Sequence, residues 1–137
     1  MIIGIGSDIC RIDRIEKSLL RFGKRFENRC FTSTEQSIAE GKKAIKAAFY
    51  AKRFAAKEAF VKAIGGEIKN SLSWLDIEIV NLINGQPVIN LTDHANRILN
   101  KIIPQGFEPK LFLTLSDDYP NAIAFVIIEA IEIKKRD

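Results

Sequence analysis

Residues 43–64 read KAIKAAFYAKRFAAKEAFVKAI and set the architecture of the chain. The segment is rich in alanine, lysine and phenylalanine and holds neither glycine nor proline, a composition that favours a long helix. Gly65 and Gly66 follow immediately, and glycine supplies the left-handed backbone conformation in which helices commonly end. We therefore expect a long central helix that forms the spine of the domain.

A strand and two helices are expected before this spine. Residues 2–6 (IIGIG) indicate a buried strand, and apolar side chains at helical spacing predict a helix from Arg11 to Phe22. Thr32 and Glu35 have the spacing of a capping box, which predicts a short helix running toward Glu40.

After the spine, the pattern changes to strands joined by short turns. A strand over Leu75–Val80, the Asn84–Gly85 turn and a strand over Pro87–Leu91 predict a β-hairpin. Connections this short cannot hold a crossover, so the strands pair antiparallel. The expected fold class is α+β, with an antiparallel sheet packed against the long central helix. The elements expected beyond the hairpin are a helix from Thr92 or Asp93 to Ile103 and a strand pair, Leu111–Leu115 with Ala122–Ile133.

The size and the charge of the chain limit what the protein can be. Its 137 residues match one domain, so we expect a single domain over residues 1–137. The 21 lysines and arginines exceed the 17 acidic residues and give a net charge of +4, which suits acidic or phosphorylated partners. The basic residues are not interleaved with aromatic side chains, which disfavours nucleic-acid binding. Lys134, Lys135 and Arg136 are expected to form a solvated tail.

Cysteine, histidine and apolar content exclude further classes of protein. Cys10 and Cys30 are too few for a disulfide scaffold or a cysteine-based zinc site and fit a reduced cytosolic protein. His94 is the single histidine, so multi-histidine zinc sites are excluded, whereas carboxylate sites for hard cations stay open. The amino terminus reaches Asp8 before a signal-peptide core could form, and the longest apolar run, residues 122–128, is too short for a membrane span. We expect a cytoplasmic protein with no membrane partner.

Two carboxylates are candidate site residues. Asp8 follows part of a dinucleotide fingerprint whose third glycine is replaced by Ile9, and it either caps the first helix or holds a metal. Glu58 lies on a small apolar stripe of the central helix, where a carboxylate needs a partner. That partner is either Lys62, one turn later, or a hard cation shared with Asp8. Mg²⁺ takes one or two carboxylates and completes its shell with water and substrate phosphate.

The basic residues near these carboxylates have two interpretations. Arg53 and Lys57 share one helix face, which is either a solvated face or a source of phosphate contacts. Gly65 and Gly66 could let a ligand approach the backbone. A basic cluster in and after the first helix is either solvated or suited to an acidic protein. Its members are Arg11, Arg14, Lys17, Arg21, Lys24 and Arg25.

Taken together, these motifs resemble the two signatures of the 4'-phosphopantetheinyl transferases. The residues that carry the resemblance are Ile5–Asp8 and Phe54–Lys62. The similarity continues over nearly the whole chain through Arg14, Gly65 and the NGQP turn at 84–87. It implies the fold of that family and the transfer of phosphopantetheine from coenzyme A to a serine of an apo acyl carrier protein, with release of adenosine 3',5'-bisphosphate.

The resemblance also implies a role for each candidate residue. Asp8 and Glu58 would coordinate Mg²⁺ together with the pyrophosphate, and a water or Glu58 would accept the serine proton. Lys62 would contact phosphate or assist departure of the nucleotide. The other implied contacts are coenzyme A with Arg53, Lys57, Lys62, Gly65 and Pro87, and the acidic carrier protein with Arg14, Arg21 and Arg25.

Small members of this family form trimers with active sites where subunits meet, and they usually serve fatty-acid synthesis, so the resemblance implies a homotrimer. Many relatives carry histidine after the serine of the closing strand, where this chain has Asp117, so a histidine-assisted step is not carried over. The competing hypothesis is a noncatalytic module that binds an acidic carrier protein or a nucleotide. Binding that ignores Mg²⁺ and yields no product would distinguish it.

Overall fold

The computed structural model describes residues 1–66 and 70–134, so Lys135 and Arg136 of the expected basic tail lie outside the described residues. None of the helices in these ranges has the length and apolar character that crossing a membrane requires. In chain order the elements are β1 (Ile2–Arg11), α1 (Ile12–Phe22), α2 (Lys24–Cys30), α3 (Ser33–Glu40), η1 (Lys43–Ile45), α4 (Lys46–Ile64), η3 (Trp74–Asp76), β2 (Ile77–Asn81), β3 (Pro87–Leu91), α5 (Asp93–Asn100), β4 (Phe107–Asp118) and β5 (Asn121–Glu132).

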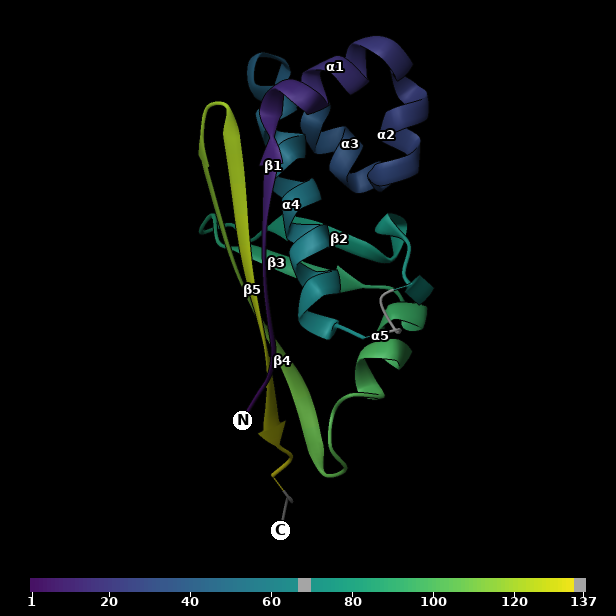
Figure 1. Cartoon of the computed structure of the whole chain (residues 1–137), viewed down its shortest axis with the longest axis vertical. Helices are drawn as coiled ribbons and strands as arrows, with labels where there is room; N and C mark the ends of the chain where they lie inside the picture. Colours follow the sequence, from purple (N-terminus) through teal and green to yellow (C-terminus); the bar gives the residue numbers. More distant parts are fainter. Residues whose placement is uncertain (67–69, 135–137) are drawn as a thin grey trace.

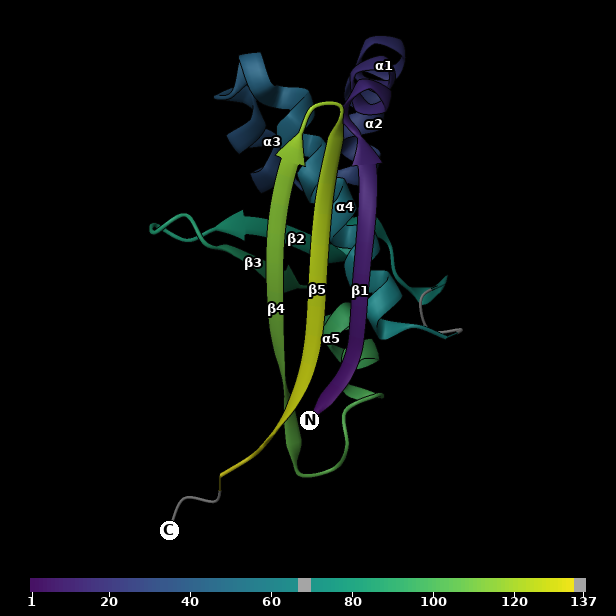
Figure 2. The ribbon, with the colours of Figure 1, turned by 60° about the vertical axis from the view of Figure 1, so that its left-hand side comes forward.

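Three long antiparallel strands form the main sheet, in the order β1-β5-β4 (Figure 2). Helix α4 lies along one face of this sheet, as both views show (Figures 1 and 2). Alternate side chains of β5, among them Ala122, Ala124 and Val126, are fully buried on that side. The predicted fold class, an antiparallel sheet packed against a long central helix, is confirmed.

Strand β1 approaches α4 so closely that two of its positions have no room for a side chain. A Cβ atom on Gly4 would lie 2.0 Å from the carbonyl oxygen of Ala63, and one on Gly6 would lie 2.0 Å from that of Ala59. Glycine at both positions lets the backbone of the strand rest directly on the helix. Side chains two residues apart share a face of a strand, so this approach also carries Asp8 toward α4.

The remaining elements surround α4. Helices α1, α2 and α3 pack at one end of it, and α5 lies near the other end (Figure 1). The β2–β3 hairpin runs across the long strands, on the same side of the sheet as α4 (Figure 2). Its turn is closed by the Gly85 N–H, which donates to the Leu82 carbonyl at 2.8 Å, and Thr32 and Glu35 form the capping box of α3. The predicted hairpin and capping box are therefore confirmed.

The structure departs from the sequence predictions at several boundaries. Strand β1 continues to Arg11 because its pairing with β5 extends as far as Asn121. Arg11 is the residue that precedes α1, so the alternative in which Asp8 caps this helix is wrong. Helix α2 was not expected; Gly23, with a φ of 53°, ends α1 and turns the chain into it.

Candidate active site

Asp8 and Lys62 meet across the contact between β1 and α4. The Lys62 ammonium donates to Asp8 Oδ1 at 3.0 Å and to the carbonyl oxygen of Ser7 at 3.0 Å. The Asp8 side chain is 17% exposed and that of Lys62 is 55% exposed, so the pair opens to solvent. Lys62 thus pairs with Asp8 on the neighbouring strand, so the alternative in which Lys62 is the partner of Glu58 within the helix is wrong.

Glu58 lies one turn before Lys62 on α4 and is partly buried. Its Oε1 atom accepts a hydrogen bond of 2.8 Å from the indole Nε1–H of Trp74 on η3. The Trp74 ring packs on Phe54, with ring centroids 5.6 Å apart and planes inclined by 30°. The acid on the apolar stripe therefore finds its partner in a tryptophan sixteen residues along the chain.

The charges of Asp8, Glu58 and Arg14 act on one buried thiol. Burial raises the pKa of Cys10 to about 11; the negative charges of Asp8 and Glu58 raise it further, and the charge of Arg14 lowers it. Coulombic effects weaken with distance, so Asp8, Arg14 and Glu58 all lie in the neighbourhood of Cys10. Asp8 and Glu58, which come from separate sequence motifs, therefore belong to the same region of the structure.

The surface around these carboxylates is hollowed. Three adjoining hollows share lining residues: the first holds Asp8 and Arg14, the second Arg25, and the third Glu58. Phe54 lines the first two, and Trp74 lines the last two. We call this connected depression the α4 groove. It places both candidate acids beside a surface that an extended ligand could follow.

The donor set fits a hard cation bound together with a phosphate. Within the described residues, no group of three or more histidine, cysteine or acidic side chains is placed to hold a metal ion. Asp8 and Glu58 alone cannot enclose a cation, but Mg²⁺ keeps several waters and commonly binds through one or two carboxylates plus substrate phosphate. Lys62, already on Asp8, adds a positive charge for such a phosphate.

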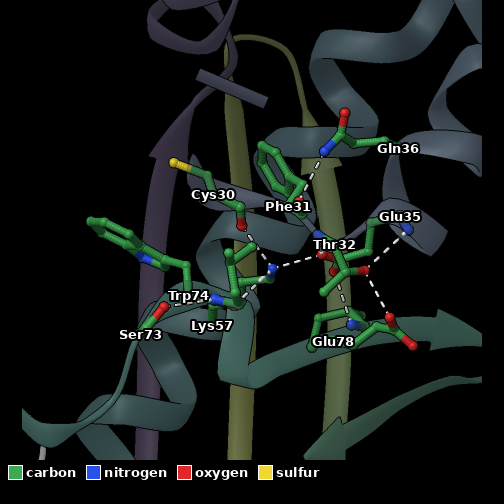
Figure 3. A network of polar contacts seen from close by, with 11 residues as sticks. Cys30, Phe31, Thr32, Glu35, Gln36, Lys57, Ser73, Trp74 and Glu78 are labelled. Carbon is green, nitrogen blue, oxygen red and sulfur yellow. Dashed lines mark hydrogen bonds and ion pairs between the residues drawn. The ribbon is translucent and has the colours of Figure 1, made fainter. Parts of the chain in front are cut away.

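Lys57 lies in the interior, behind the lining of the α4 groove, and does not line the groove itself. Its ammonium donates to Glu35 Oε1 at 2.7 Å, to the Cys30 carbonyl at 2.8 Å and to the Trp74 carbonyl at 3.1 Å (Figure 3). The side chains of Lys57 and Glu35 are both 0% exposed, and burial lowers the pKa of Lys57. An ammonium group has three donors, and all three are used. The alternative in which Lys57 lies on a solvated helix face is wrong, because its ammonium is bound in the interior. Its contact with coenzyme A stays a prediction.

Arg53 is also buried, on a different side of α4 from Glu58. At about 100° per residue, the two side chains are separated by about 140° around the helix. The guanidinium stacks on Phe49, with its carbon 3.8 Å from the ring centroid, and donates to Asn81. Among the described residues its Nε atom has no hydrogen-bond partner, and burial lowers its pKa to about 10. The solvated position expected for Arg53 is therefore wrong as well.

A second hollow, of ≈ 620 Å³, surrounds Arg53. Asn81 belongs to its lining and pairs in register with Pro87, so the predicted coenzyme A residues Arg53 and Pro87 lie near each other. Asp117, at the far end of β4, also lines this hollow and pairs with Lys52 at 3.2 Å. The other residues lining it are Ile38, Lys42, Ile45, Ala48, Phe49 and Gly85. We call it the Arg53 pocket.

The arginines predicted to bind a partner lie beside the α4 groove. Arg14, Arg21 and Arg25 are exposed on α1 and α2, and Arg14 and Arg25 line the groove itself. Arg21 extends over the Phe22 ring at 5.1 Å from its centroid. Gly65 ends α4 with a φ of 68°, one turn beyond Val61, whose carbonyl accepts its N–H.

The structure thus separates the predicted site residues. Asp8, Glu58, Lys62 and Arg14 lie at the α4 groove, and Arg53 and Pro87 lie at the Arg53 pocket. Lys57 belongs to neither, because its ammonium is bound in the interior. Sequence reasoning missed Trp74 and Arg29, which line the groove next to Glu58. Neither belongs to a motif, and the count of a single tryptophan in the chain was the one signal available for Trp74.

Comparison with known proteins shows what this arrangement belongs to. The family model of the 4'-phosphopantetheinyl transferase superfamily matches residues 4–124. The chain belongs to this superfamily. Among its curated relatives in the superfamily, the holo-[acyl-carrier-protein] synthase of Rhizobium rhizogenes is 52% identical over 133 residues, which cover 97% of this chain and 98% of the relative.

Solved structures of the superfamily share the fold. The holo-[acyl-carrier-protein] synthase of Neisseria meningitidis has a TM-score of 0.81 at 34% identity, with 94% of this chain and 99% of that chain covered. The synthase of Bacillus anthracis, solved in complex with CoA (3',5'-ADP), has a TM-score of 0.76 at 36% identity and covers 96% of this chain and 99% of its own. The fold implied by the sequence motifs is therefore confirmed.

Proposed function

We propose that this protein transfers the 4'-phosphopantetheine group of coenzyme A to a serine of an apo acyl carrier protein and releases adenosine 3',5'-bisphosphate. The observation that carries the proposal is that Asp8, Glu58 and Lys62 lie at the α4 groove, in a chain 52% identical to a holo-[acyl-carrier-protein] synthase. Two acids from separate motifs meet there beside a cation, which suits a phosphoryl group under attack.

Asp8 and Glu58 are the residues that would hold Mg²⁺ with the pyrophosphate of coenzyme A. When bound, the ion supplies positive charge that stabilises the phosphoryl group during transfer. Lys62 can contact the phosphate while it stays bound to Asp8, because its side chain is 55% exposed and its ammonium has a further N–H to donate. Its charge stabilises the negative charge that develops on the departing nucleotide.

The Arg53 pocket supplies the other contacts to coenzyme A. The Nε–H of Arg53 is buried and unpaired among the described residues, and a buried unpaired donor is costly unless a ligand accepts from it. A phosphate oxygen fits this requirement. Lys42 adds a second cation to the pocket, and Pro87 lies near its lining at the start of β3.

Because these two groups of residues lie on different sides of α4, we place the complete site between copies of the chain. The outer face of the main sheet offers a surface for such assembly, since it exposes apolar side chains from all three strands. These are Ile5 at 59%, Ile9 at 66%, Ile123 at 45%, Phe125 at 39% and Phe112 at 41% exposure. An apolar sheet face of this kind marks an interaction surface. The proposed assembly is a homotrimer in which each site combines the groove of one copy with the Arg53 pocket of the next.

The carrier protein docks on the basic surface of α1 and α2. Arg14 and Arg25 line the groove and Arg21 lies beside them, so an acidic partner held there presents its serine toward Asp8. Complementary charge of this kind raises the association rate and fixes orientation. The proposal retains the single domain, the cytoplasmic location and the service to fatty-acid synthesis expected from the sequence.

The test is the intact mass of an apo acyl carrier protein after incubation with this protein and coenzyme A. One tube holds Mg²⁺ and a second holds excess chelator. We expect one phosphopantetheine added in the first tube and none in the second, and Glu58→Ala should abolish the addition. Coenzyme A or carrier binding that ignores Mg²⁺ and yields no product would instead support the noncatalytic binding module.

A further inference from the structure

We propose that Trp74 is a positioning residue that fixes the Glu58 carboxylate for a divalent cation, an inference that rests on the magnesium site of the proposed function. The indole Nε1–H donates to Glu58 Oε1 at 2.8 Å. This hydrogen bond engages one carboxylate oxygen and leaves Oε2 for the ion. Mg²⁺ demands near-ideal octahedral geometry, so a carboxylate held to present one oxygen suits it better than a freely rotating one.

The indole is a donor with no alternative role. The indole N–H can only donate a hydrogen bond, whereas a hydroxyl or a side-chain amide can also accept one. In this bond Trp74 is therefore always the donor and the Glu58 carboxylate always the acceptor. Groups that hydrogen-bond to a metal ligand in this way orient the ligand and tune its affinity for the ion.

Trp74 is itself held in place by the buried network around Lys57. The Lys57 ammonium donates to the Trp74 carbonyl at 3.1 Å, and Glu35 holds that ammonium from the opposite side at 2.7 Å (Figure 3). Glu35 in turn accepts from the backbone N–H groups of Thr32 and Ile79, both at 2.9 Å. Lys57 and Glu35 are each held by several hydrogen bonds, and such a satisfied buried network is rigid. The network therefore fixes the backbone of Trp74, from which the indole projects.

The ring is restrained as well as the backbone. Phe54, one turn before Glu58 on α4, stacks on the indole. Ser73 and Asp76 form a capping box around η3, in which Ser73 N–H donates to Asp76 Oδ2 at 2.9 Å. Backbone, ring and capping contacts thus define one orientation of the N–H. A loosely held tryptophan could not position a ligand, whereas this one is set on rigid elements.

A purely structural role for the same bond makes a different prediction. If the N–H only satisfied a partly buried carboxylate, its loss would lower stability and leave the affinity for the ion unchanged. A positioning role instead weakens metal binding by about 10–100-fold. It leaves the KM for coenzyme A nearly unchanged at saturating metal.

The experiment compares wild type with Trp74→Phe, which keeps an aromatic ring on Phe54 and removes the N–H. Mn²⁺ serves as the probe, measured by the electron paramagnetic resonance of the free ion in the presence of coenzyme A and without carrier protein. The matched control is Leu75→Ala, on the same short helix and 43% exposed. We expect Mn²⁺ affinity to fall about 10–100-fold in Trp74→Phe, with a parallel rise in the Mg²⁺ concentration for half-maximal turnover, and to stay unchanged in the control.

Equal Mn²⁺ affinity in Trp74→Phe and wild type would overturn the positioning role while leaving the magnesium site intact. Failure of wild type to bind Mn²⁺, with turnover indifferent to chelator, would overturn the magnesium site and this inference with it. Should Trp74→Phe unfold, wild type still decides, because Trp74 is the single tryptophan of the chain. A saturable change of its fluorescence with Mg²⁺ that is lost in Glu58→Ala supports the inference, and an unresponsive signal overturns it.

Discussion

Replacing Gly6 with alanine should separate β1 from α4 and disable the site. The added Cβ would lie 2.0 Å from the Ala59 carbonyl oxygen and 2.8 Å from the Ala63 nitrogen. Both are backbone atoms of the helix, so neither can rotate away as a flexible side chain would. The strand has to move outward by more than an ångström before the contact becomes an ordinary van der Waals distance.

This displacement determines the size of both effects. Overpacking a well-packed interface costs about 1–3 kcal/mol, which in a domain of this size lowers the melting temperature by roughly 5–10 °C. Asp8 follows Gly6 by two residues on the same face, so it moves with the strand away from Lys62 and α4. A misplacement of about 1 Å at a catalytic group can reduce the rate by about 100-fold. We expect kcat/KM to fall by about that factor even where the variant is fully folded.

The assay is carrier-protein modification at a temperature well below the melting transition, with melting followed by circular dichroism. Ser7→Ala is the matched control, because this side chain is exposed on the opposite face of β1 and its role at the site is carried by its backbone carbonyl. It should behave as wild type. Gly6→Ala with unchanged melting and full activity would refute the close approach of β1 to α4.

Three further outcomes are expected. Lys57→Met should lower the free energy of unfolding by about 3–5 kcal/mol in urea titration, because it leaves the buried Glu35 charge unpaired; adding Glu35→Gln should recover part of the loss. The folded protein holds the Cys10 proton to about pH 11, whereas an unperturbed thiol releases it near 9.0, so the free energy of unfolding should fall as pH rises across that interval. In Cys10→Ala that decline should be shallower, and an identical slope would contradict it. Arg21→Glu with Arg25→Glu should raise the KM for the carrier protein at least tenfold at low salt and leave the KM for coenzyme A unchanged, with the effect shrinking as salt is added.

The sequence predicted the elements whose signals are local. The central helix is bounded by a glycine pair, and the capping box needs only Thr32 and Glu35. The hairpin is signalled by Asn84 and Gly85, although its turn runs from Leu82 to Gly85. The end of β1 depends on pairing with Asn121, more than a hundred residues away, and so could not be read from nearby residues.

Burial of Arg53 and Lys57 could not be predicted for a related reason. Helical periodicity assumes that a helix buries one face. Helix α4 is instead packed against β1, β5, α1, α3 and β2, so polar side chains on several of its faces are buried and bind polar groups of these neighbours. For the site itself, the residue pattern singled out Asp8, Glu58 and Lys62 with alternatives left open, and the resemblance to the family implied their roles. The hydrogen bond from Trp74 to Glu58 joins two different helices, so no periodic pattern in the sequence indicates it.

The Arg53 pocket and the α4 groove lie on different sides of one helix, so in the proposed assembly the activity of each site depends on two neighbouring copies of the chain. A copy with a defective groove still contributes an intact Arg53 pocket to the site of its neighbour. A copy with a defective pocket still contributes an intact groove. Mixing two inactive variants, Asp8→Ala and Arg53→Ala, would therefore rebuild intact centres wherever the two sound halves adjoin. Two alleles that each fail alone would complement one another within a single cell.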